Sequence, residues 1–110
     1  MRGFRQFDAP ISIVVCFDSA LLDNTISHFD TGAMTYGLVL AAWSRGLGAV
    51  INGQGAMQSP VVREVANIPD DQVILTCVAL GWPEEDFVAN SVVSRRRPIE
   101  NTARFLGFEE

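Results

Sequence analysis

Residues 31–55 read TGAMTYGLVLAAWSRGLGAVINGQG, and this stretch decides the fold. From residue 30 to residue 43 nearly every side chain is apolar or small, which predicts one long helix without a solvent-facing stripe. An ordinary surface helix carries a single apolar row, so two rows indicate burial on both sides, one side being against another subunit. The first row comprises Phe29, Ala33, Tyr36, Leu40, Trp43 and Leu47, and the second comprises Met34, Leu38, Ala41 and Ala42.

A glycine-rich turn and loop follow this helix. Gly46 and Gly48 are expected to end it, as glycine commonly does just past a helix end. Ala49-Val50-Ile51 predicts a short buried strand, and Asn52-Gly53-Gln54-Gly55 then forms a loop. Because glycine lacks a Cβ, its backbone can approach a ligand closely, which makes this loop a candidate binding site.

Two longer apolar runs lie on either side of the central stretch. Residues 11–17 and 72–81 are nearly continuous in apolar residues, which predicts two central strands covered on both faces. Ser59 before Pro60 predicts a short helix from Pro60 to about Ala66, with serine as its N-cap. Asp30 or a nearby residue is expected to cap the long helix.

These elements suit one domain over residues 1–110, of α/β (α+β) class, with about three strands, flanking helices and a long buried helix at a dimer contact. Three strands are few for a self-contained sheet. The chain is therefore expected to be a partial domain, which belongs to a larger unit or completes itself as an oligomer.

Composition and charge exclude several classes of function. Hydrophobic residues make up 48% of the chain, which is typical of globular proteins. The net charge of −5 argues against nonspecific binding to nucleic acid or to an anionic membrane. The first ten residues lack the apolar core of a signal peptide, so a cytoplasmic location is expected.

Candidate nucleophiles and metal ligands are few. Cys16 and Cys77 lie inside the predicted strands without metal-binding spacing and are interpreted as buried free thiols. His28 is the only histidine and has no orienting partner in any motif, so we interpret it as structural. No metal site is expected.

Two motifs invite a phosphate or nucleotide interpretation. Gly53-x-Gly55 lacks the third glycine of a dinucleotide fingerprint, because Gln58 stands there, so that fingerprint is excluded. Arg95-Arg96-Arg97 is either a solvated turn or an anion site, most simply for a phosphate. The residues alone thus indicate an α/β domain with a glycine loop and an arginine cluster.

Several segments, in order, resemble the carboxy-terminal half of the FMN-dependent nitroreductase family. The segments follow the order found in the family and span nearly the whole chain, which makes the resemblance fairly specific. The segments are Phe7–Ile11, Asp30–Gly48, Ile51-Asn52-Gly53, Ile68–Asp71 with Val78–Glu84, Arg96–Glu100, and Ala103–Glu110.

The resemblance implies a homodimer with FMN at the subunit interface and the central helices packed against each other. Ile51-Asn52-Gly53 sits at the family's flavin loop, and the backbone amides of Asn52 and Gly53 would face the N5 and O4 edge of the ring. Asn52 replaces the family's common acidic residue, which a main-chain contact tolerates. Arg96 would pair with the FMN phosphate, with Arg95 and Arg97 as alternatives, because a guanidinium matches phosphate oxygens.

The implied activity is an NAD(P)H-dependent oxidoreductase. FMN would take hydride from NADH or NADPH at N5 and reduce a small-molecule electron acceptor, a nitroaromatic compound or a quinone. No catalytic side chain is expected, because the flavin carries the chemistry.

The family's amino-terminal Arg-Ser-x-Arg segment, which grips the FMN phosphate and ribityl chain, is not in this sequence. We therefore expect a truncated or naturally short form, or a fragment. The alternative function is a non-enzymatic dimeric remnant that acts as a structural or interaction domain.

Overall fold

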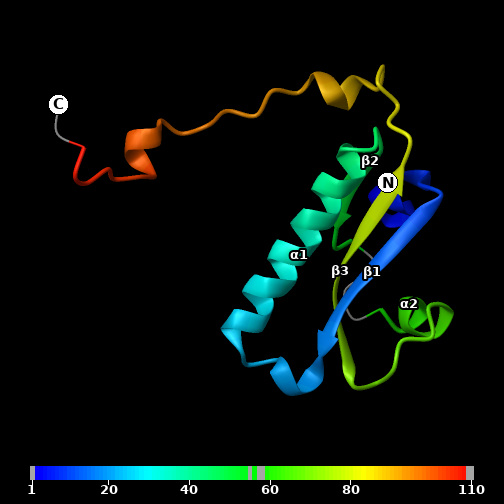
Figure 1. Ribbon diagram of the computed structural model, residues 1–110. Coiled ribbons are helices and arrows are strands. Elements are labelled where there is room, and N and C mark those ends of the chain that lie inside the picture. The colour runs from blue at the N-terminus through cyan, green and yellow to red at the C-terminus, as the bar shows by residue number, and fades with distance from the viewer. Residues whose placement is uncertain (1, 55, 57–58, 109–110) are drawn as a thin grey trace.

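Three antiparallel strands form a sheet in the order β1-β3-β2 in the computed structural model of the chain, which describes residues 2–54, 56 and 59–108. Helix α1 packs against β1 and β2, and the short helix α2 lies toward the other side of the sheet (Figure 1). This arrangement confirms the α+β class with three strands. The elements are β1 (Ile11–Asp18), α1 (Thr25–Trp43), β2 (Gly48–Asn52), α2 (Pro60–Val65) and β3 (Gln72–Gly81), with 3-10 turns at Arg2–Asp8, Ser19–Leu21, Val88–Ser91 and Ile99–Asn101.

The core is centred on β3. Ile74 and Val78 are 1% and 0% exposed, and Cys77 is also buried. The strand pairs with β1 along one side and β2 along the other, as its continuous apolar run predicts for a central strand. Val15 and Phe17 of β1 complete this core.

The two outer strands correct the sequence analysis. Residues 11–17 were predicted to form a central strand, but β1 is an edge strand and Ile11 is 51% exposed. Residues 49–51 were predicted to be buried, but Val50 and Ile51 are both largely exposed on β2. An apolar run identifies a strand but not its position in a sheet, and among the described residues each of these strands has a strand neighbour on one side only.

Helix α1 begins earlier than expected. Its N-cap is Asn24 and not Asp30: the Asn24 Oδ1 accepts hydrogen bonds from the amides of Ile26 at 3.0 Å and Ser27 at 3.3 Å. At the other end Gly46 adopts φ +74°, and the Leu47 amide donates to the Ala42 carbonyl at 3.1 Å. This is a Schellman ending, so the prediction that Gly46 ends the helix is confirmed.

Within one chain, α1 is buried on one side only. Thr35 and Ala42 are its buried residues, and the Thr35 hydroxyl is satisfied by donating to the Thr31 carbonyl at 2.7 Å. The first apolar row faces away from the sheet and stays open. Its large members within the helix are 46–76% exposed: Phe29, Tyr36, Leu40 and Trp43. Burial on both sides therefore requires a partner.

Helix α2 follows the sequence prediction closely. Ser59 caps it by accepting the Val62 amide at 3.3 Å, and Pro60 is its first residue. Arg63 stabilises the turn between α2 and β3, because its guanidinium donates hydrogen bonds to the carbonyls of Pro69 and Gln72.

The carboxy-terminal tail, residues 83–108, leaves the sheet and extends away from it (Figure 1). The radius of gyration is 17.4 Å, compared with about 13 Å for a compact domain of this length. The tail also exposes large apolar side chains, among them Val93 at 91% and Phe108 at 82%. Such a tail contributes little to the core of its own chain.

The Ile74→Ala substitution tests the position of the core. It leaves a cavity at a side chain that is 1% exposed, so unfolding free energy should fall by about 2–5 kcal/mol. The measurement is urea denaturation at one protein concentration. The control Val93→Ala, on the tail, should change stability by less than about 0.5 kcal/mol; equal losses for both variants would contradict this core.

Candidate functional site

The candidate loop starts where β2 ends. Asn52 pairs in register with Cys77 of β3, and residues 53–54 continue beyond the strand. Ile51 is 48% exposed, Asn52 only 9%, and Gly53 lies between these extremes. The structure thus places the three predicted flavin-loop residues side by side, with an apolar side chain open to solvent next to the turn. Gly55, the other glycine of the motif, lies outside the described residues.

The Asn52 side chain makes contacts that the sequence did not predict. Its Nδ2 donates to the Gly3 carbonyl at 2.7 Å and to the Gln6 Oε1 at 3.3 Å. Its Oδ1 accepts the Gln54 amide at 3.1 Å. The only sequence signal was an asparagine directly after a strand, which favours such a bond to its own loop; nothing in residues 2–8 identified the other partners.

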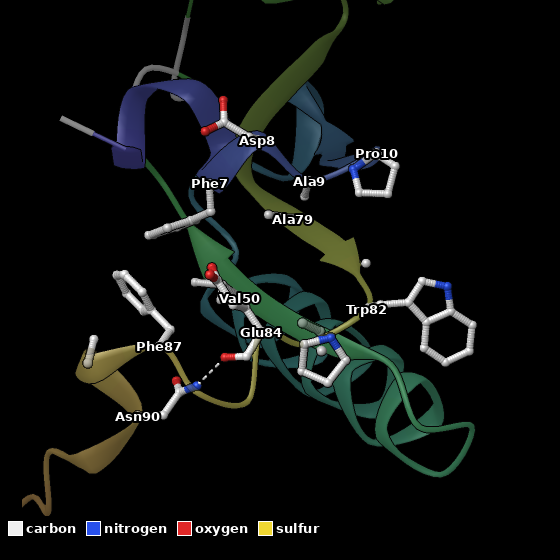
Figure 2. A pocket seen from close by; sticks show the side chains of 15 residues that line it. Phe7, Asp8, Ala9, Pro10, Val50, Ala79, Trp82, Glu84, Phe87 and Asn90 are labelled. Atoms are coloured by element: carbon white, nitrogen blue, oxygen red, sulfur yellow. Dashed lines mark hydrogen bonds between the residues drawn. The ribbon is translucent and has the colours of Figure 1, made fainter.

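A hollow of about 610 Å³ lies over β2 and the adjoining end of β3, next to residues 7–10 (Figure 2). Val50 and Ala79 form part of its apolar wall, and the aromatic rings of Phe7 and Phe87 lie along one side of it. The Asn90 Nδ2 donates to the Glu84 carbonyl at 2.8 Å and fixes the local tail. Sequence reasoning missed this hollow because its walls come from three separate stretches of the chain, at residues 7–10, 48–50 and 79–90.

The predicted arginines lie elsewhere. Arg95, Arg96 and Arg97 are all exposed on the tail, away from the sheet that carries the loop (Figure 1). The Arg96 guanidinium donates to the carbonyls of Ser94 and Arg95, each at 3.3 Å. One chain therefore does not bring the arginine cluster and the glycine loop together.

The cysteines are poorly suited to nucleophilic chemistry. Burial raises the pKa of the Cys77 thiol above its usual value, against the smaller opposing effects of hydrogen bonds from Ser12 and the Val78 backbone. Burial also raises the pKa of Cys16, opposed by the positive charge of Arg63. Both thiols stay protonated at neutral pH, whereas the thiolate is the nucleophile.

His28 is held as a structural residue. Its Nδ1 lies 2.9 Å from the Asn24 carbonyl, and its ring packs edge-on against Phe17 with centroids 4.8 Å apart. Residues 2–54, 56 and 59–108 contain no cluster of His, Cys, Asp and Glu that could hold a metal ion. No helix in that same part of the chain has the length and apolar character to cross a membrane.

Comparison with known sequences identifies relatives for most of the chain. The sequence model described as "Nitroreductase family" matches residues 1–82. Chloronitrobenzene nitroreductase of Comamonas testosteroni is 32% identical over 105 residues, which cover 96% of this chain and 45% of that protein. Nitrobenzene nitroreductase of Ectopseudomonas oleovorans is 31% identical with the same coverage. The chain spans about half the length of these curated relatives.

Solved structures share the fold. The FMN and NADPH-dependent nitroreductase NfnB from Sphigopyxis sp. strain HMH superposes with a TM-score of 0.84 at 22% identity, over 94% of this chain and 46% of that one. The NADPH:FMN oxidoreductase from Vibrio harveyi, complexed with NAD+, has a TM-score of 0.64 at 26% identity, over 93% and 48%.

Proposed function

Because the chain belongs to the nitroreductase family, we propose that it is the FMN-binding part of an NAD(P)H-dependent oxidoreductase that reduces nitroaromatic compounds or quinones. The match over residues 1–82, which includes the loop after β2, carries this proposal. Two similar proteins support the cofactor and the co-substrate: one is an FMN- and NADPH-dependent nitroreductase, and the other is an NADPH:FMN oxidoreductase.

When bound, FMN supplies the hydride acceptance and the electron delivery to the acceptor. The residues of this chain supply binding and orientation. The loop fits the edge of a flat heteroaromatic ring, since the partly exposed backbone at Gly53 lies next to the exposed side chain of Ile51. The Asn52 side chain is already bonded within the protein, so Asn52 would meet the ring through its main chain.

The arginine cluster fits a phosphate by its chemistry, because a guanidinium can form two parallel bonds to phosphate oxygens. Arg96, with Arg95 or Arg97, is the proposed phosphate partner. These residues lie on a tail that extends away from the loop of the same chain. We therefore propose that the tail of one copy contacts the loop of a second copy.

The proposed assembly is a homodimer built on α1. Phe29 and Trp43 are each 76% exposed along one face of this helix, with Tyr36 and Leu40 between them. A contiguous apolar face of this kind marks a contact surface in a protein that stays in solution. The free thiols of Cys16 and Cys77 suit a reducing compartment, which supports the cytoplasm as the proposed location.

A flavin absorption spectrum with a matched variant tests the cofactor proposal. Wild-type protein dialysed against FMN should be yellow, whereas Gly53→Val should lose most flavin and reductase activity. A Cβ at that position would stand between the loop backbone and the ring. The variant should keep the size and secondary structure of the wild type, because residue 53 is not in the core.

Two results would count against this. A colourless wild type after incubation with FMN would favour the non-enzymatic dimeric remnant. Full flavin occupancy and turnover in Gly53→Val would show that the ring lies elsewhere.

Arg96→Ala tests the phosphate contact. Loss of a charge-assisted hydrogen bond costs on the order of 1.5–3 kcal/mol, so FMN should bind roughly ten- to a hundredfold more weakly. Riboflavin, which lacks the phosphate, should be affected far less. Fluorescence titration with both ligands is the measurement, and Arg104→Ala on the same exposed tail is the control. Equal losses of FMN and riboflavin would rule out phosphate recognition by Arg96.

Leu40→Asp tests the assembly. A carboxylate in the middle of the exposed α1 face should leave monomers or aggregates, because the charge would have to be buried at the contact. Light scattering after size-exclusion chromatography gives the mass. Val65→Asp is the control, since Val65 is 81% exposed on α2, away from that face. A wild-type protein that is monomeric at micromolar concentration would refute the dimer.

A further inference from the structure

The Asn52 side chain is the junction of two distant parts of the chain. Both of its Nδ2 hydrogens are used, one by the Gly3 carbonyl at 2.7 Å and one by the Gln6 Oε1 at 3.3 Å. Its Oδ1 accepts a hydrogen bond from the Gln54 amide at 3.1 Å. At 9% exposure, Asn52 leaves little room for water to replace a lost partner, so these bonds are costly to break.

A fourth hydrogen bond closes a ring of residues. The Gln6 Nε2 donates to the Gln54 carbonyl at 3.4 Å, so Asn52, Gln6 and Gln54 are each bonded to the other two. Gln6 and Phe7 have φ values of 50° and 57°. Residues other than glycine rarely adopt this left-handed backbone region. The segment therefore needs contacts with other parts of the chain to stay in it. We name this ring, with the Gly3 carbonyl, the Asn52 latch.

The latch requires an amide at position 52. An aspartate has nearly the same shape and could still accept the Gln54 amide. It could not donate to the Gly3 carbonyl, and one of its oxygens would face that carbonyl oxygen at close range. The residue type at 52 is therefore set by the amino-terminal segment and not by the needs of the loop alone.

We propose that Asn52 is a positioning residue: its side chain couples residues 3–6 to the loop at 52–54 and so holds the loop backbone in the conformation that receives the flavin ring. This inference rests on the proposed function for the identity of the ligand. It adds a role for the side chain of Asn52, beyond the main-chain contact that the family resemblance implies.

Two variants of this chain test the latch. Asn52→Asp keeps the shape and removes the donors, whereas Gln6→Ala removes only the two longer bonds. Asn52→Asp should weaken FMN and riboflavin equally, by about tenfold, because the loop meets the ring and not the phosphate. Gln6→Ala should cost both ligands about threefold. Hydrogen exchange on the flavin-free protein should rise together in residues 3–8 and 50–54, while β3 stays protected.

The outcomes separate the two proposals. If the wild type binds flavin and Asn52→Asp binds FMN and riboflavin as tightly, the positioning role is wrong and the proposed function stands. If the wild type binds neither flavin, the proposed function fails and the positioning role fails with it, even where the exchange of the two segments rises together, because the latch is then a structural contact only. Loss of β3 protection in Asn52→Asp would mean unfolding, and Gln6→Ala then decides by its effect on the two flavins.

Discussion

The pairing of β3 with both of its neighbours is the constraint on which the rest of the structure depends. β3 is the last strand in the sequence and the middle strand of the sheet, so β1 and β2 reach their places only through it. Its pairing sets Asn52 opposite Cys77 and thereby positions the loop that follows β2. The strand's own core residues, Ile74 and Val78, are almost fully buried, which gives this pairing its hydrophobic stabilisation.

The sequence predicted the helices and strands better than it predicted their positions in the fold. Apolar runs located β1 and β3, and the Ser59-Pro60 signal located α2, because strand and helix formation depend on local pattern. The same pattern could not show that β1 lies at an edge, since that depends on which strands are available as neighbours. The start of α1 at Thr25, after the Asn24 cap, was missed because the first helical turn is mostly polar and resembles a loop.

For the candidate site too, the sequence predicted local features but not the contacts between distant segments. Family resemblance pointed to Ile51, Asn52 and Gly53, and the structure places this stretch at the end of β2; its contact with a flavin stays a prediction. The Asn52 latch and the hollow were not predictable, because each joins stretches of the chain that are distant in sequence through contacts without a local signature. The assignment of the arginines at 95–97 to a phosphate site stays a prediction, and the sequence pattern gave no information about the direction in which the tail leaves the domain.

The edge positions of β1 and β2 affect how this chain can associate with other chains. In the described part of the chain, each has a strand neighbour on one side, so each presents a row of backbone donors and acceptors along its other side. The exposed apolar side chains of Ile11 and Ile51 lie on these same strands. An uncovered strand edge is a template on which another extended chain can pair, either in a native assembly or in an aggregate.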